Sequence, residues 1–192
     1  MAPACAVGLS LHTGWAAACV VTARPLRVLL RERLVLLGDP ERFVFHRAAE
    51  LAPGEAARSV ARARKLADAG ALAALGKLLE AAREAGLQPR RVAVVARHGE
   101  LPPLAEILVA HPRIHTGEGW FFRDVLLGAA QAHGLAAHVY PPRELEALAA
   151  KALALRSAAL ASELSRLGKE LGPPWGKDQR LAALAAWAAL AS

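Results

Sequence analysis

Three apolar runs separated by turn residues open the chain and predict an antiparallel meander of three strands. Residues 5–11 are almost continuously apolar, a pattern typical of a strand covered on both faces. Residues 12–14 (HTG) supply a turn, and residues 15–22 supply a second apolar run. A break at residues 23–25 (ARP) then leads into a third predicted strand over residues 26–37.

The third predicted strand partly alternates between basic and apolar residues. Because successive side chains of a strand point to opposite faces, we expect the meander to have one basic, solvated face. Arg27, Arg31 and Arg33 point to that face, and Val28, Leu30 and Leu34 point to the other.

The rest of the chain predicts helices interrupted by two further strands. Three antiparallel strands followed by two helix-connected strands give an α/β fold with a mixed five-stranded sheet and helices on both faces. No repeat or low-complexity linker divides residues 1–192, so we expect one domain. The predicted elements after the meander are a short helix or strand at 43–51, a helix at 55–85 that Gly70 kinks or splits, a strand at 91–96, a loop at 97–119 with one helical turn, a helix at 120–133, a strand at 135–140, and helices at 141–168 and 178–190.

The composition suits a folded domain with a basic surface. Of the 192 residues, 55% are apolar and 21% are charged, which excludes an intrinsically disordered chain. The formal net charge of +7 favours a polyanionic partner, either nucleic acid or an anionic surface. We expect a soluble, cytoplasmic protein, because the apolar run at 181–191 is too short for a membrane span and the one at 4–21 is broken by a turn.

The two cysteines, Cys5 and Cys19, form no C-x-x-C pair, which excludes a zinc ribbon and a thioredoxin-type motif. If residues 5–21 form a hairpin, the two thiols could form a cross-strand disulfide. Because the sequence shows no export signal, we expect buried free thiols instead.

Three short segments, in order along almost the whole chain, carry a resemblance to a known superfamily. They are residues 7–16 (VGLSLHTGWA), residues 86–95 (GLQPRRVAVV) and residues 177–185 (KDQRLAALA). They resemble the opening strand and hairpin, the helix end with the fourth strand, and the final helix of RuvC- and YqgF-type Holliday-junction resolvases. The resemblance implies an RNase H-like fold, whose element order matches the one predicted above. We expect the glycines of the first segment to let the backbone approach a phosphate or a metal closely.

The resemblance also implies a catalytic site that this sequence largely lacks. In the superfamily, carboxylates on the first strand, at the end of the fourth strand and on the final helix hold two Mg²⁺ ions, which activate water for attack on a phosphodiester. The first position falls here on Ser10, and the second on Val95 or within two residues after it. On the final helix Asp178 matches one acid, and Leu181 stands where the second would be.

Asp178 is the one candidate catalytic residue that the resemblance retains. A plainer interpretation is that it is an N-cap or first-turn acid that complements the helix dipole. Glu100, Glu118 and Glu144 could replace the missing acids, although nothing in their spacing requires it. We therefore expect no cofactor and no resident metal, with Mg²⁺ or Mn²⁺ implied only if the chain is a nuclease.

Basic and hydroxyl side chains near the predicted strand ends form a candidate phosphate-binding set. Arg97 and His98 follow a buried strand, and ligands of open α/β sheets bind beyond the carboxyl ends of strands. The plainer interpretation of His12 and Thr13 is an exposed turn, and that of Ser10 is a small buried strand residue. The full set is Ser10, His12, Thr13, Arg97, His98 and Lys177.

His111 and His115 share the i, i+4 spacing of helical zinc sites. Pro112 lies between them, and no third ligand is evident from the sequence. We therefore expect no metal at this pair.

The sequence contains two further patterns, one aromatic and one basic, whose binding partners it does not identify. The consecutive aromatics at 120–122 (WFF) cannot all face one side of a helix, so at least one is expected to be exposed or at an interface. A basic stripe on the long predicted helix is either a solvated face or a track for a nucleic-acid backbone. That stripe consists of Arg58, Arg62 and Lys65.

These features predict a catalytically degenerate RuvC-like protein that binds structured nucleic acid or serves as a scaffold for a partner. One alternative is an active, divergent nuclease dependent on Mg²⁺ or Mn²⁺. Another is a phosphate- or nucleotide-binding module like half of an actin-type ATPase, a class that needs a second lobe for which 192 residues leave no room. The partners left open are nucleic acid and a second copy of the chain, with no membrane expected.

Overall fold

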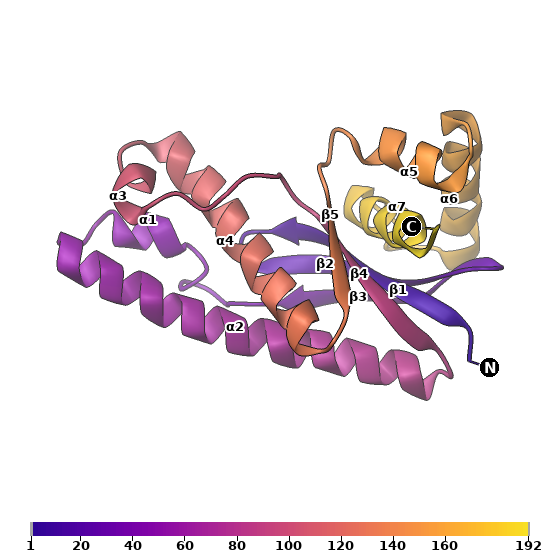
Figure 1. The fold of residues 1–192 in the computed structure, drawn as a ribbon, viewed down its shortest axis with the longest axis horizontal. Coiled ribbons are helices and arrows are strands. Elements are labelled where there is room, and N and C mark those ends of the chain that lie inside the picture. Colours follow the sequence, from indigo (N-terminus) through magenta and orange to yellow (C-terminus); the bar gives the residue numbers. More distant parts are fainter. Residues whose placement is uncertain (1, 192) are drawn as a thin grey trace.

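The computed structural model describes residues 2–191 and confirms the predicted mixed five-stranded sheet (Figure 1). The strands lie in the order β3-β2-β1-β4-β5. The first three are antiparallel, whereas β4 runs parallel to β1 and β5 runs parallel to β4. Their bounds are β1 (Ala4–His12), β2 (Trp15–Ala23), β3 (Leu26–Val35), β4 (Gln88–Val95) and β5 (Ala136–Tyr140).

Helices cover both faces of the sheet, as predicted, and each group has its own core. The helices α1 to α4 pack on one side and α5 to α7 on the other (Figure 1). Alternate residues of β1 serve the two cores, with Val7 and Leu9 on the side of α2 and α4 and Ala6 on the side of α7. The helices are α1 (Val44–Ala48), α2 (Pro53–Glu84), α3 (Leu104–Ile107), α4 (His111–Ala132), α5 (Leu145–Leu153), α6 (Ser157–Leu171) and α7 (Lys177–Ala191).

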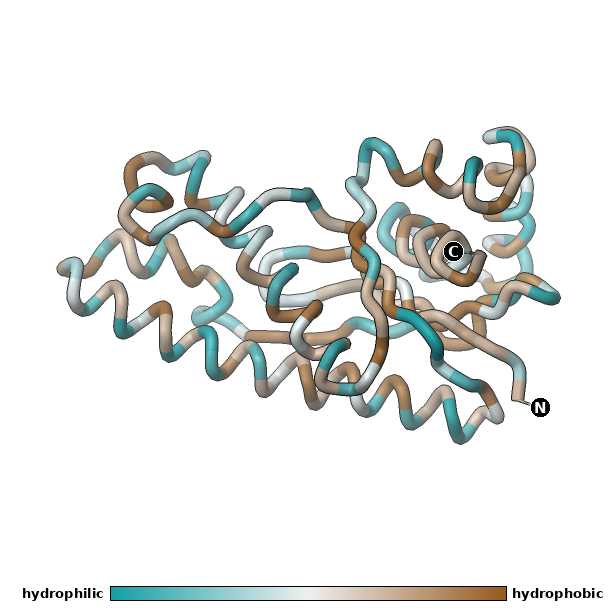
Figure 2. The backbone as a smooth tube through the Cα atoms, in the orientation of Figure 1, coloured by the Kyte–Doolittle hydropathy of each residue, from teal (hydrophilic) through white to brown (hydrophobic). Residues whose placement is uncertain are grey.

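The helix α2 is unbroken over 32 residues, so the predicted kink at Gly70 is wrong. Hydrophobic and hydrophilic residues alternate along its length, as expected for a helix with one buried face (Figure 2). A Cβ atom at Gly70 would collide with the carbonyl group of Leu36, just after β3. The glycine therefore allows a close crossing of the chain over α2 and does not bend the helix.

Two other helix boundaries differ from the predictions. The helix α4 begins at His111 and not at residue 120, so the end of the predicted loop is helical. Pro112 does not oppose this start, because a proline in the first helical turn lacks only an N–H that would be unpaired anyway. The predicted helix at 141–168 is divided into α5 and α6, because Ala154 adopts a left-handed conformation with φ of 52°.

The predicted basic face of β3 is only partly solvated, because the end of α6 lies against it. Arg31 donates three hydrogen bonds, of 2.7, 2.9 and 3.1 Å, to carbonyl oxygens within residues 171–174. A guanidinium group is favourable there, since carbonyl groups at a helix C-terminus carry partial negative charge. Arg27 and Arg33 remain exposed.

The prediction that Val28, Leu30 and Leu34 share one face is wrong. The pairing of β2 with β3 shifts register between Val20 and Val21. Val28 therefore packs in the core on the α7 side, whereas Leu34 packs in the core on the α2 side.

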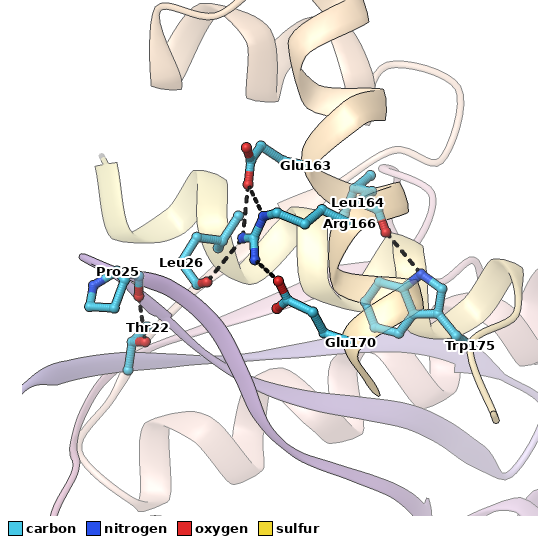
Figure 3. Close-up of polar contacts among 8 residues, drawn as sticks. All are labelled: Thr22, Pro25, Leu26, Glu163, Leu164, Arg166, Glu170 and Trp175. Atoms are coloured by element: carbon cyan, nitrogen blue, oxygen red, sulfur yellow. Dashed lines mark hydrogen bonds and ion pairs between the residues drawn. The ribbon is translucent and has the colours of Figure 1, made fainter. Parts of the chain in front are cut away.

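The segment between α6 and α7 is held against α6 (Figure 3). Trp175 donates its indole N–H to the carbonyl oxygen of Leu164 at 3.1 Å. On the same helix, Arg166 pairs with two glutamates and reaches the carbonyl oxygen of Leu26 at the start of β3, at 3.4 Å. These contacts tie α6 to the sheet and fix the place at which α7 begins.

Both cysteines are buried free thiols, as predicted. Burial raises the pKa of Cys5 to about 11, an effect that the nearby charge of Arg83 partly offsets. Burial also raises the pKa of Cys19 to about 12, partly offset by Arg31. Among the described residues, no helix has the length and apolar character needed to cross a membrane.

Candidate nucleic-acid-binding cleft

A cleft of about 390 Å³ opens where β1 and β4 end. These strands are parallel neighbours, so their carboxyl ends meet at one edge of the sheet, the usual position for ligands in open α/β sheets. Ser10 pairs in register with Val95, so two positions singled out by the resemblance lie side by side. The cleft is lined by Leu11, His12, Thr13, Val95, Ala96, Arg97, His115, Thr116, Gly119, Trp120 and Pro142.

Gly8 allows α7 to lie directly on the sheet and thereby sets the position of Asp178. A Cβ atom at Gly8 would collide with the carbonyl group of Ala182 on α7. Ser10 lies two residues beyond Gly8 on the same face of β1, and Asp178 lies about one helical turn before Ala182 on α7. Both offsets are about 5–7 Å long, so Asp178 comes to lie beside Ser10. The predicted reason for this glycine, close approach to a phosphate or metal, is therefore wrong. Gly14 serves the hairpin turn, where it adopts φ of 80°.

Asp178 turns its carboxylate toward β1. The hydroxyl of Ser10 donates to Asp178 Oδ1 at 3.2 Å, and His12 Nε2 lies 3.0 Å from the same oxygen. Asp178 is not the N-cap residue, since α7 begins at Lys177, and the backbone N–H of the preceding Gly176 donates to the side-chain oxygen of Gln179 at 3.0 Å. Asp178 is thus more than a first-turn acid, because it links α7 to β1 at the edge of the cleft.

His12 joins this carboxylate to the hairpin. Its ring stacks on Trp15, with centroids 4.2 Å apart and planes inclined by 4°, and Arg33 lies 4.0 Å over the Trp15 ring. The Nε2 atom is buried and close to Asp178, but the geometry does not meet that of a hydrogen bond. The two groups are therefore in close polar contact without forming a hydrogen bond. Stacking on Trp15 therefore holds the polar ring of His12 in place where it lines the cleft.

The loop after β4 is anchored from α4. Arg123 is buried and donates to the backbone oxygen of Arg97 at 3.0 Å, while its other nitrogens bond Asp124. Trp120 donates its indole N–H to the backbone oxygen of His98 at 3.0 Å. Two adjacent backbone carbonyls are thus held by α4, and the Arg97 side chain stays exposed at the cleft. Of the three aromatics at 120–122, only Trp120 remains partly exposed.

The structure gathers most of the predicted phosphate-binding set at one edge. Ser10 and His12 contact Asp178, whereas Thr13 and Arg97 line the cleft. His98 lines an adjoining pocket together with Arg97. Lys177 is exposed at the start of α7, beside Asp178 in the chain, and does not line the cleft.

The side chains around Asp178 do not fit a pair of Mg²⁺ ions. Magnesium requires hard oxygen ligands in near-octahedral geometry, and carboxylates are its usual protein ligands. Ser10 and Asp178 offer one hydroxyl and one carboxylate, whereas Val95 and Leu181 offer only hydrocarbon. The single carboxylate is also already engaged by Ser10 and His12.

The acids considered as replacements lie in other surroundings. Glu118 is buried and contacts His46 at 2.9 Å, Glu144 lines the pocket shared by Arg97 and His98, and Glu100 is exposed. Among residues 2–191, no group of three His, Cys, Asp or Glu side chains with metal-ligand spacing includes Asp178.

Sequence reasoning missed His46 and Arg123, and it considered Glu118 only as a replacement for a missing acid and not as a partner of His46. Each acts through a partner distant in the chain, and His46 and Glu118 are 72 residues apart. The spacing of His111 and His115 was a usable signal, but Pro112 and the lack of a third ligand counted against it. The structure removes both objections, since Pro112 lies in a first turn and His46 joins the pair.

No family model matches the chain, and no curated protein matches it in sequence. Among solved structures, it is similar to T. thermophilus RuvC in complex with a Holliday junction substrate, with a TM-score of 0.54 and 14% identity over 98% of this chain and 93% of that one. A second structure of Thermus thermophilus RuvC gives a TM-score of 0.49 and 16% identity over 97% of this chain and 93% of that one. The chain therefore has the RNase H-like fold of RuvC resolvases, as its sequence motifs predicted.

Proposed function

We propose that this protein binds branched nucleic acid through the cleft at the ends of β1 and β4, without cleaving it by a two-metal mechanism. The observation that carries the proposal is the composition of the site where β1, β4 and α7 converge. A hydroxyl, an imidazole and one carboxylate occupy it, and Arg97 lies exposed at its rim.

The binding half of the proposal rests on charge and fold. The net charge of +7 favours a polyanion, and Arg97 and His98 lie beyond a strand end, where a phosphate is well placed. The related fold of T. thermophilus RuvC is known in complex with a Holliday junction, which makes a branched substrate the first to test.

The non-cleaving half rests on the missing acids. Two-metal cleavage needs carboxylates that bridge or flank the ions, and only Asp178 remains at the positions that the resemblance identifies. Its contacts with Ser10 and His12 give this carboxylate a structural role that does not require a metal.

Fluorescence anisotropy tests the binding half, with a labelled four-way junction, a duplex and a single strand compared in a chelating buffer. We expect the junction to bind most tightly, and its affinity to fall by orders of magnitude between about 50 and about 200 mM salt. Arg97→Ala is expected to weaken binding and reduce the salt slope by about 1. Arg90→Ala is the matched control, because Arg90 is an exposed arginine near the other end of β4.

Incubation of the junction with Mg²⁺ or Mn²⁺ tests the non-cleaving half, and we expect the junction to remain intact. Cleavage that Asp178→Asn abolishes would instead identify a divergent nuclease. A chain that binds none of the three nucleic acids would overturn the binding half and favour the scaffold interpretation.

A further inference from the structure

Three histidines converge beside the cleft, from two helices that are distant in the sequence. His111 and His115 lie in the first turns of α4, and His46 comes from α1. Their ring centroids are 4.5–5.1 Å apart, and one nitrogen from each lies within 4.8 Å of the others. Within residues 2–191 this histidine cluster is the only group of three His, Cys, Asp or Glu side chains with such spacing.

The cluster forms because α1 packs closely on α4. A Cβ atom at Gly117 would lie 2.9 Å from Ile107 and 3.2 Å from the ring of Phe45, so only glycine leaves room for both short helices. Phe45 is buried in that contact, and its neighbour His46 is thereby held against the first turns of α4. The proximity of the three imidazoles is therefore built into the packing of the core.

A buried carboxylate supports one of the three rings from behind. Glu118 is 1% exposed, and its Oε1 lies 2.9 Å from His46 Nδ1. Carboxylates are rarely this buried unless they are paired. With Nδ1–H donated to Glu118, the lone pair of His46 is on Nε2, free to bind a ligand. Metal-binding histidines almost always have such an outer partner, which fixes the tautomer and makes the ring a better donor.

We propose that His46, His111 and His115 bind one divalent transition-metal ion of the zinc class, with Glu118 as the outer partner of His46. Imidazole suits zinc, nickel and copper, whereas magnesium and calcium require oxygen ligands. Three protein ligands leave one position of a tetrahedral ion for water or another ligand. Zinc–nitrogen bonds of about 2.0–2.1 Å place ligand nitrogens about 3.3 Å apart, so nitrogens up to 4.8 Å apart need to approach by up to about 1.5 Å. His111 and His115 are exposed and free to make that movement.

The site adjoins the cleft, because His115 also lines it. A bound dication would therefore add positive charge next to the surface that we propose for phosphates. The metal site nevertheless stands apart from the proposed function, since its residues differ from Ser10, His12, Asp178 and Arg97 and its occupancy can be measured without nucleic acid.

Calorimetric titration of the full chain with zinc, after dialysis against a chelator, tests the proposal. We expect one zinc ion per chain, and Co²⁺ in its place is expected to give the visible absorption of a tetrahedral site. His111→Ala and His46→Ala are each expected to weaken zinc binding by more than the roughly 10–100-fold that loss of an outer partner costs. His133→Gln is the matched control, because His133 lies at the far end of α4 and bonds the carbonyl oxygen of Leu72.

A chain that takes up no zinc would overturn the inference, and so would a His111→Ala variant with wild-type affinity and an unchanged cobalt spectrum. His111 is exposed, so this variant is informative even if His46→Ala fails to fold. Either negative result leaves the nucleic-acid measurements in chelating buffer unaffected.

Discussion

Two carboxylate–histidine pairs lie near the same cleft, since His12 lines it and His46 contacts the lining residue His115, but their carboxylates differ in exposure. Asp178 is about one-third exposed and receives His12 and Ser10 as neighbours, so the carboxylate itself lies near the surface. Glu118 is buried, whereas the imidazole of His46 that contacts it is partly exposed. An acid behind a histidine strengthens that histidine as a metal ligand, whereas an acid beside a histidine and a hydroxyl forms a local polar contact. The same two residue types therefore support different chemistry, depending on whether the carboxylate is buried behind the imidazole or shares the surface with it.

The largest expected effect concerns the packing of α7 on β1, which positions Asp178. Gly8→Ala should lower the free energy of unfolding by about 3 kcal/mol, because the added methyl group collides with the backbone of α7. Urea unfolding measures the change. Gly128→Ala is the control, since a Cβ there meets no atom within 4 Å beyond its own stretch of helix, and alanine in a helix should stabilise by up to about 1 kcal/mol. A loss below about 1 kcal/mol at Gly8 would show that α7 can shift away from β1 at little cost.

Matched amide substitutions distinguish the two acids directly. Glu118→Gln should weaken zinc binding by about 10–100-fold, because the amide no longer draws the proton of His46 Nδ1 as strongly. Asp178→Asn should leave zinc affinity unchanged, since Asp178 is not part of the histidine cluster. Calorimetry on both variants is the measurement. Equal losses in the two variants would mean that the two pairs are coupled through the cleft.

Arg123, which anchors the loop after β4, should contribute less to stability than the packing at Gly8. Arg123→Met should cost about 1–2 kcal/mol of stability, because the backbone oxygen of Arg97 and the carboxylate of Asp124 both lose a charged donor. Arg113→Met provides the comparison, since Arg113 makes one exposed hydrogen bond of 3.3 Å and should change stability by less than about 0.5 kcal/mol. Thermal unfolding of both variants ranks them, and equal effects would argue against a special role for the buried guanidinium.

The smallest effect concerns a histidine outside both pairs. Burial, together with the charge of Arg91, lowers the pKa of His138 below its ordinary value of 6.5. The unfolded chain therefore takes up a proton at this residue before the folded chain does, so stability should fall as the pH drops below about 6.5. His138→Gln should remove this part of the pH dependence, which we expect to stay below about 0.5 kcal/mol. Identical pH profiles for the two proteins would contradict the assignment.

The strands were predictable because their signal is local. Continuous apolar runs and the turn around Gly14 gave the first two strands, and the parallel strands followed from similar runs. The start of α4 was not predictable, since Pro112 and Gly117 interrupt the helical pattern of apolar residues there. Gly70 was misjudged for a related reason, because its role is a contact with Leu36 and a sequence does not display contacts.

The Asp178 site and the histidine cluster differed in the same way in how far the sequence predicted them. Ser10 and Asp178 could be singled out because motifs at the two ends of the chain resemble one family, and the sheet then brings them together. His46 carries no comparable signal, since it lies in a five-residue helix and is identified as a candidate ligand only by its contacts with Glu118 and His115 on α4. A pairing created only by tertiary packing leaves no trace in local periodicity.

The two buried thiols give the protein a practical chemical property. A thiolate, not a thiol, attacks maleimides and iodoacetamides, and the raised pKa values of Cys5 and Cys19 leave almost no thiolate near neutral pH. A single cysteine introduced at the surface would therefore be labelled selectively while the two native residues remain in place. Fluorescent or spin reporters attached in this way could be positioned around the cleft to follow a bound ligand.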